Sequence, residues 1–438
     1  MRYRVTRKDI PALRWCTVLI DDFMPIKTAL VLLAILLLTG RFFASAQNNT
    51  LQFYQEQALK NSPLLKDYQN QYASFKLDSL GIKARYKPQV GLNSSGVFAP
   101  VIHGYGYDGS ITNIQTLSGV VGANQSLDSK SYIKAQLKML GLAADSINNT
   151  RNISEQDLNR SVTGQYITAY GSLQQLEFNQ SVNQLLFKEE KILKALTRSN
   201  VYRQSDYLTF LVTLQQQSLQ LSQSRIQFQN DFAMLNYLAG IEDTTTVKLQ
   251  NPRIEVSIKP QITNSIFFKQ YSLDSIRLVN SRKIIDFSYR PRASIFADGG
   301  YNTGFIAPFA HNFGTSAGFS LTMPIYDGRR RKLQYKKLDM EENTRQNYRA
   351  FFTRQYNQQI ALLQQQISGN EGLIKQITEQ LKYSERLVTV DFELMQTGDL
   401  RVADLVLAIN NYLLARNQLT LNQINGLQLI NQLNYWKK

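Results

Sequence analysis

Apolar residues recur every seven positions along the last third of the chain. Six of them, from Ile360 to Met395, are spaced seven apart, and the same spacing resumes after a break at residues 397–399. A strict seven-residue period predicts long helices whose apolar seam supercoils against neighbouring helices. The sequence therefore predicts a helix over 328–397, about 105 Å long at 1.5 Å per residue, followed by a tight turn and a returning helix over 401–436.

Alternating apolar and polar positions predict four β-strands in two pairs. The clearest alternation begins at Phe313, where Phe, Ala, Leu, Met and Ile interleave with Gly and Ser. Such a period of two indicates strands with one apolar and one polar face. The predicted strands cover residues 88–99, 116–127, 291–303 and 313–326.

The order of predicted elements occurs twice. Tyr86-Lys-Pro-Gln-Val and Tyr289-Arg-Pro-Arg-Ala stand 203 positions apart, and the Arg-x-x-Asp sequences that begin at Arg203 and Arg401 stand 198 apart. Internal similarity at long offsets indicates a duplicated architecture. We expect a first repeat over 47–240 (a helix, two strands, a long helix over 129–198, a helix over 205–240), an equatorial linker over 241–262, and a second repeat over 263–438.

The amino-terminal segment reads as a secretory signal peptide over residues 1–46. Its apolar run of eleven residues, 28–38, follows Lys27 and precedes Ala44-Ser45-Ala46. The run is too short for a membrane-spanning helix, and this arrangement predicts cleavage before Gln47. Met24 is a possible true start. A buried apolar helix of the fold is the alternative interpretation.

Composition excludes several classes of site. The net charge is +16, of which residues 1–46 carry +4, and the remaining basic residues look scattered except for the run 329–332. Because neither a basic stripe nor a reading motif is evident, we expect no nucleic-acid partner. The only cysteine lies in the predicted signal peptide, and the two histidines lie in loops. We therefore expect neither a metal site nor a cofactor.

The alternating strands are typical of a membrane barrel, because lipid cannot satisfy the backbone groups of an open sheet edge. Four strands cannot close a barrel, since single-chain barrels begin at about eight. The chain must then oligomerise, and three copies, which give twelve strands, leave a plausible pore. A soluble sheet with one face on a core is the alternative.

Several motifs together resemble TolC-type outer-membrane efflux proteins over essentially all of residues 47–438. They are, in order, Pro88-Gln89, Leu235-Asn-Tyr237, Pro291-Arg292, Pro324-Ile-Tyr-Asp-Gly328, Gly398 with Asp404-Leu405, and Leu433-Asn-Tyr435. The resemblance implies an α+β membrane protein. In it, a homotrimer would form a twelve-stranded outer-membrane β-barrel in contact with lipid, continued by a coiled-coil periplasmic tunnel. It also implies a periplasmic adaptor (membrane fusion) protein, an inner-membrane transporter of RND, ABC or MFS type, and export of drugs, small molecules or proteins.

The resemblance assigns candidate gate residues to the predicted helix turns. In that family, acidic residues at the periplasmic tip constrict the pore and bind cations; Asp404 matches one such position, and Asp206 is its counterpart in the first repeat. The next acidic position is Leu407 here, which departs from a double acidic ring. Arg203 and Arg401 could hold the tip closed through ion pairs. Alternatively, both aspartates only stabilise helix starts, and exposed arginines contribute little.

The two turns are also the predicted docking surface for the adaptor. Gly398 makes the second bend and belongs to the expected gate. Asn200 and Val201 in the first turn, and Thr397 and Asp399 in the second, are the residues expected to contact a periplasmic partner.

Two further classes of function remain open on sequence alone. A surface adhesin or receptor would use loops 100–115 and 303–312 without exporting anything, and a soluble coiled-coil scaffold would leave the strands and signal peptide unexplained. We expect no enzyme, because the sequence shows no nucleophile, base and orienter set, no metal-ligand spacing and no phosphate loop.

Overall fold

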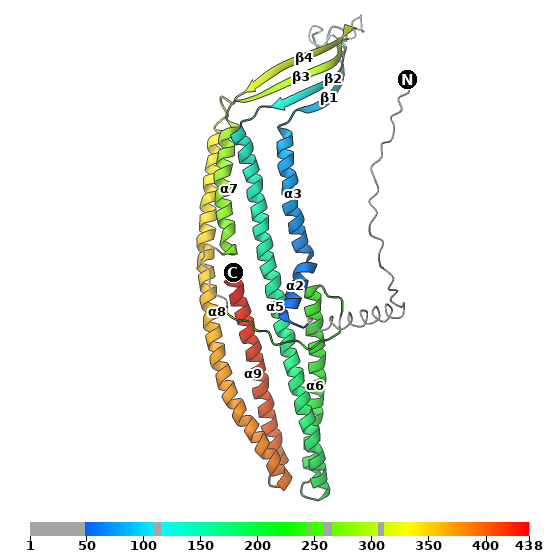
Figure 1. Cartoon of the computed structure of the whole chain (residues 1–438), viewed down its shortest axis with the longest axis vertical. Helices are drawn as coiled ribbons and strands as arrows, with labels where there is room; N and C mark the ends of the chain where they lie inside the picture. Colours follow the sequence, from blue (N-terminus) through cyan, green and yellow to red (C-terminus); the bar gives the residue numbers. More distant parts are fainter. Residues whose placement is uncertain (1–48, 109–114, 244, 257–264, 305–310, 438) are drawn as a thin grey trace, which may run out of the picture. The chain divides into compact units, whose positions relative to one another are not determined.

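Long helices and one four-stranded antiparallel sheet make up the protein (Figure 1). The computed structural model describes residues 49–108, 115–243, 245–256, 265–304 and 311–437, which belong to a single compact unit, Asn49–Lys438. The predicted signal peptide lies outside the described residues. Among the helices that the structure describes, none is both long enough and apolar enough to cross a bilayer.

The first half of the chain forms two strands between helices. Its elements are α2 (Leu51–Asn61), α3 (Pro63–Arg85), β1 (Gln89–Phe98), β2 (Gln115–Ser126), α5 (Lys130–Arg198) and α6 (Gln204–Ala239). Ser62 separates α2 from α3, and its hydroxyl accepts a hydrogen bond from the Leu65 N–H at 3.4 Å. Pro63 then occupies the first helical position, where its missing N–H costs nothing. Gly240, in the left-handed region at φ 65°, ends α6.

The second half consists of one helix, two strands and two further helices. They are α7 (Ile266–Ser288), β3 (Arg292–Thr303), β4 (Phe313–Thr322), α8 (Arg330–Thr397) and α9 (Val402–Trp436). Strand β4 ends four residues before the predicted limit of 326, and Pro324, which has no N–H for a ladder bond, lies in the shortened stretch. Helix α8 begins at Arg330 and not at 328, because Gly328 and Arg329 have left-handed φ angles of 63° and 68°.

The register of the sheet separates apolar from polar residues. The strand order is β1-β2-β3-β4, and Ala123 pairs with Val90 on one side and with Ala297 on the other, which pairs with Ala317. Opposite residues share a face. One face therefore carries Val90, Leu92, Phe98, Leu117, Val121, Ile295, Tyr301, Phe313, Phe319 and Leu321. The other carries mainly polar residues, Gln89, Asn93, Ser95, Ser118, Asn124, Ser294, Asp298, Asn302, Ser316 and Ser320, together with Val97, Val120 and Phe296.

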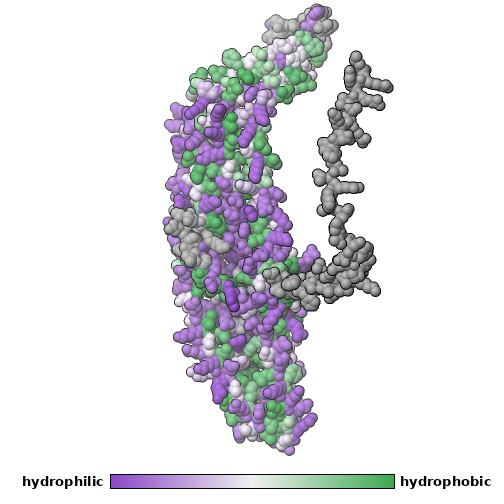
Figure 2. Space-filling view, in the orientation of Figure 1, coloured by the Kyte–Doolittle hydropathy of each residue, from purple (hydrophilic) through white to green (hydrophobic). Residues whose placement is uncertain are grey.

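Neither face of the sheet is covered by another element within the described residues. Every residue of β1 is exposed, as is every residue of β4 except Gly318, which is half-buried. Figure 2 shows hydrophobic and weakly polar residues over the sheet, whereas the helices are mostly hydrophilic. The soluble alternative, a sheet packed on a core, is therefore not what the structure shows. The outer backbone groups of β1 and β4 also lack a partner strand in the described chain.

Each long helix packs against several shorter ones along its length. Helix α5 packs against α2 and α3 near the sheet and against α6 beyond them, while α8 packs against α7 and then α9 (Figure 1). With 69 and 68 residues, the two long helices are each roughly 100 Å in length at 1.5 Å per residue. Among the described helices next to the sheet, the main contacts run from α3 to α5, from α5 to α7 and from α7 to α8, so these four helices form a layer in that order.

Along α9 the seven-residue spacing is apolar at Leu405, Tyr412, Leu419 and Leu433 but falls on a glycine at Gly426, and this gap has a physical reason. Buried Asn370, on α8, donates a hydrogen bond to the Asn422 carbonyl at 3.0 Å and accepts one from Asn425 at 3.2 Å. A Cβ at Gly426 would lie only 2.8 Å from the Asn370 amide nitrogen. The missing side chain therefore makes room for a polar contact that fixes the register of α8 against α9.

Candidate functional site

The two helix turns, residues 199–203 and 397–401, lie against each other at the end of the helices far from the sheet (Figure 1). The Tyr202 hydroxyl donates a hydrogen bond to the Met395 carbonyl oxygen at 3.1 Å. A Cβ built on Gly398 would lie 2.7 Å from a methyl carbon of Val201. A glycine at this point therefore allows the close approach of the two turns.

Both turns use the same backbone bonding. Asn200 and Gly398 adopt the left-handed conformation, at φ 58° and 85°. The next residue of each turn donates its N–H to the carbonyl five positions earlier, as in a Schellman end. These bonds are Val201 N to Leu196 O at 3.0 Å and Asp399 N to Leu394 O at 3.1 Å.

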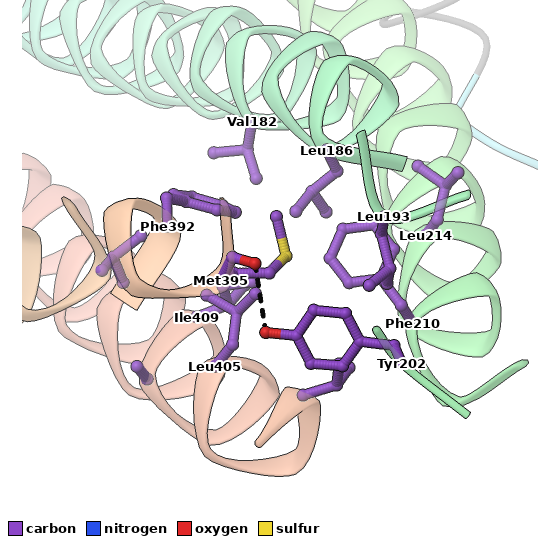
Figure 3. Close-up of a cluster of buried hydrophobic side chains, with 13 residues drawn as sticks. Val182, Leu186, Leu193, Tyr202, Phe210, Leu214, Phe392, Met395, Leu405 and Ile409 are labelled. Carbon is purple, nitrogen blue, oxygen red and sulfur yellow. Dashed lines mark hydrogen bonds between the residues drawn. The ribbon is translucent and has the colours of Figure 1, made fainter. Parts of the chain in front are cut away.

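A buried apolar cluster, which we call the tip core, joins the two hairpins immediately above the turns (Figure 3). It comprises Val182, Leu186, Leu193, Tyr202, Phe210, Leu214, Val388, Phe392, Met395, Val402, Leu405, Ala408 and Ile409. All four long helices of this end, α5, α6, α8 and α9, contribute residues. Because buried apolar clusters are closely packed, the ends of the two hairpins form one rigid unit.

The predicted aspartates both occupy the third position of a helix. Asp206 accepts a hydrogen bond from the Arg203 backbone N–H at 3.2 Å, which is the helix-start role that sequence analysis kept as the alternative. Asp404 instead binds the Arg401 guanidinium through two bonds, 2.8 Å from Nε and 3.1 Å from a terminal nitrogen. The Arg401 side chain is 84% exposed, so this pair contributes about 0–1 kcal/mol to stability.

A further acidic residue, Asp391, was missed at the sequence level. It is buried on α8 between Val388 and Met395, within the apolar stripe. Burial raises the pKa of its carboxyl group, and the negative charge of Asp404 raises this pKa further. The carboxyl group next to Asp404 is therefore supplied by Asp391 on α8. The position on α9 where the resemblance expected a further acid is Leu407, whose side chain is 60% exposed. An acid at a core position of the seven-residue pattern was the signal that could have identified it.

The four residues predicted to dock an adaptor are exposed at this end of the molecule. They are Asn200, Val201, Thr397 and Asp399. Carboxyl groups here can attract cations, but no chemistry beyond electrostatics is evident. Among the described residues, no group of three or more His, Cys, Asp or Glu side chains is placed to hold a metal ion.

Solved structures share this fold across most of the chain. An outer membrane protein of Vibrio cholerae, VceC, matches with a TM-score of 0.68 at 14% identity over 88% of this chain and 95% of that one. The open-state MtrE outer membrane channel of Neisseria gonorrhoeae matches at 0.69 and 11%, over 88% of both chains. The CmeC outer membrane channel of Campylobacter jejuni matches at 0.67 and 10%, over 88% of this chain and 85% of that one.

These likenesses confirm the predicted fold in its general form. No protein-family model and no curated protein sequence matches the chain, so the similarity is one of structure. A largely helical chain with a four-stranded antiparallel sheet is the architecture that these outer-membrane channels share with it. Nothing in the comparisons supports the adhesin alternative, and residues 109–114 and 305–310 of its two loops lie outside the described residues.

Proposed function

We propose that the chain is the outer-membrane exit duct of an export system, in which three copies form a twelve-stranded barrel continued by a helical tunnel. The observation that carries this proposal is the uncovered sheet, with an apolar face, a polar face and two unpaired edges in the described chain. In water, such a sheet would expose its apolar face and invite edge-to-edge aggregation. In a membrane, only a closed ring satisfies those edges.

The helical layer supports the same assembly. At one edge, α3 exposes Leu77 and Leu80, which are 69% and 60% accessible. At the other edge, α8 exposes Leu333 and Met340, at 63% and 69%. Both edges lie beside the sheet and lack a neighbouring helix in the described chain. Packing of one copy's α3 edge on the next copy's α8 edge would cover both and close the tunnel.

The helices near the tip present comparable apolar stripes. Three exposed residues spaced seven apart lie on α6, and three more lie on α9. Uncovered stripes of this period are coiled-coil surfaces awaiting a partner, and neighbouring copies supply one. The stripes are Val212, Leu219 and Ile226 on α6, and Leu407, Leu414 and Leu421 on α9.

The assembly would place the sheet in the outer membrane and the helices in the periplasm. A periplasmic adaptor would contact the turns at 199–203 and 397–401, and an inner-membrane transporter of RND, ABC or MFS type would deliver drugs, other small molecules or proteins. The exposed turns and the carboxyl groups of Asp391, Asp404 and Asp206 beside them favour this end as gate and docking point.

Planar-bilayer recording of the detergent-purified protein tests the proposal. We expect discrete conductance steps in neutral lipid, because a water-filled pore passes ions. Protein that is folded by circular dichroism but produces no steps at any voltage would overturn the channel function. The variant Phe319→Lys is the control. Its charge lies on the apolar face of the sheet, so it should insert less and produce fewer steps.

A further inference from the structure

Four chain segments meet where the helices join the sheet. The sheet register places the start of β1, the end of β2, the start of β3 and the end of β4 at one end. We define the collar as the three helical turns nearest that end with the residues joining them to the strands: 75–88, 127–140, 278–292 and 323–340. These segments contain seventeen Lys and Arg against five Asp, a net charge of +12.

The collar accounts for the whole charge excess of the chain after residue 46. That part has 42 basic and 30 acidic residues, so 25 of each remain outside the collar and cancel. Read along the sequence, the basic residues look scattered, with one dense run at 329–332. The fold corrects that interpretation, because it brings four separate segments to one level of the molecule.

The charges of the collar face solvent. All seventeen basic side chains are exposed. Only three of them form ion pairs within the described chain, and these tie neighbouring elements together. The pairs are Arg331–Asp286 at 2.8 Å, Arg282–Asp339 at 3.4 Å and Arg292–Asp128 at 4.0 Å.

A fourth aspartate of the collar is also engaged internally. Asp327 accepts a hydrogen bond from the Arg331 backbone N–H at 2.8 Å, and this bond and the Tyr289 hydroxyl lower the pKa of its carboxyl group. Four of the five aspartates of the collar are therefore already bound within the chain, at or near helix ends. The remaining cations are left to interact with something outside the chain.

Apolar and aromatic side chains accompany these cations on the sheet side. Ile325 and Tyr326, between β4 and α8, are 92% and 86% exposed. Leu127, between β2 and α5, is 48% exposed. Lys and Arg next to protruding aromatic and aliphatic side chains are typical of a protein at a membrane–water boundary.

We propose that the collar binds the phosphate head groups of anionic phospholipids in the leaflet that faces the helices. The inference rests on the proposed function, which places the sheet in the membrane. Cations just outside the hydrocarbon layer are attracted to anionic lipid, and the attraction fades within a Debye length. The collar begins where the strands end, so the cations on its sheet side lie nearest to those head groups. It therefore anchors the sheet at a fixed depth and selects anionic over zwitterionic lipid.

Native mass spectrometry of the detergent-purified full chain tests the collar with phosphatidylglycerol and phosphatidylcholine as probes. The test variant combines Arg330→Gln, Lys332→Gln, Lys336→Gln and Lys337→Gln, four exposed residues of α8 without an ion pair in the described chain. The matched control removes four exposed lysines from the tip half: Lys191→Gln, Lys194→Gln, Lys375→Gln and Lys382→Gln. Arg329 and Arg331 are left intact because they shape the start of α8.

We expect wild type and control to bind phosphatidylglycerol more tightly than phosphatidylcholine. In the collar variant, the affinity for phosphatidylglycerol should fall by about tenfold or more, since each cation near an anionic head group contributes to binding. Affinity for phosphatidylcholine should not change. The double variant Lys336→Gln with Lys337→Gln should show a smaller loss in the same direction, which provides a second test should the fourfold variant fold poorly.

Equal binding of both lipids, or full retention of phosphatidylglycerol binding by the collar variants, would overturn the inference. Displacement of the lipid by heparin at comparable concentration would also overturn it, in favour of a soluble polyanion as the partner. Planar-bilayer recording in pure phosphatidylcholine keeps the proposed function separate. If the protein conducts in pure phosphatidylcholine but binds both lipids equally, the proposed channel function stands and only the lipid-binding role of the collar is rejected.

Discussion

The hydroxyl group of Tyr202 donates a hydrogen bond to the carbonyl oxygen of Met395, 3.1 Å away, and so joins the turn of one hairpin to the last helical turn of the other. Both residues belong to the buried tip core. The two hairpins of a single chain are therefore fastened together at the point where a tunnel of three copies would close. Opening by relative movement of copies leaves this core intact, whereas opening within one copy breaks it.

Removal of the Tyr202 hydroxyl should weaken the tip measurably. Tyr202→Phe should lower the free energy of unfolding by about 0.5–1.5 kcal/mol, the usual net contribution of one hydrogen bond. Tyr202→Ala should cost about 3–5 kcal/mol, because it also removes a ring from the tip core. Urea unfolding followed by circular dichroism provides both values. A Tyr202→Phe protein as stable as wild type would show that the bond contributes nothing.

Loss of the Asp404 carboxylate should open the tip to ions. Asp404→Ala removes both a negative charge and the partner of Arg401. We expect higher single-channel conductance or weaker block by divalent cations in a planar bilayer. Asp206→Ala should change conductance and block less, since Asp206 binds its own helix start and not an arginine side chain in the described chain. Identical conductance and block in Asp404→Ala and wild type would remove Asp404 from the gate.

Asp391 should make the tip sensitive to pH. Its pKa is raised above the usual 3.8 by burial and then by Asp404, so the folded state holds a proton that the unfolded chain has already released. The contribution of this carboxyl group to stability is then fully present below pH 3.8 and is lost as the pH rises through the folded pKa. Asp391→Asn, which stays neutral, should melt at a higher temperature than wild type at pH 7. The two melting temperatures should converge in acid, and a constant difference at every pH would contradict this explanation.

Adjacent residues on β4 should respond oppositely to a positive charge. Phe319 lies on the apolar face of the sheet and Ser320 on the polar face. Phe319→Lys should cost about 2–4 kcal/mol of membrane stability if it faces lipid near the midplane. Ser320→Lys should insert normally and shift the ion selectivity of the pore towards anions, because it adds a positive charge to the polar face. Co-flotation of the protein with lipid vesicles on a density gradient checks the first expectation, and reversal potentials check the second. Equal insertion of both variants would show that the apolar face does not contact lipid.

Periodic positions made the elements predictable from the sequence, because a period of seven and a period of two are imposed by helix and strand geometry themselves. The strand-to-helix junction after β4 was less predictable. The alternation continues through Met323 and Ile325, but local backbone geometry at Pro324 and Gly328 ends the strand at Thr322. Pattern alone does not show where hydrogen bonding stops.

The candidate site could be predicted only in part for a related reason. Asp206 and Asp404 stand at recognisable turns, so sequence sufficed to find them. Asp391 is remote from the turn in sequence and becomes relevant only because α8 brings it near Asp404. The collar likewise depends on four segments that are separated along the chain and meet only in the fold. The basic residues of the collar are spread along the sequence but lie close together in the folded chain.

Electron microscopy of the detergent-purified protein in negative stain tests whether three copies assemble into a tube. Three copies joined through the edges of the sheet and of the helical layer predict three-fold class averages with a stain-filled axis. In side view the particle should be a tube longer than about 100 Å, the length of α5 or α8 at 1.5 Å per residue. Single-copy or two-fold particles without an axial channel would rule out this trimeric assembly.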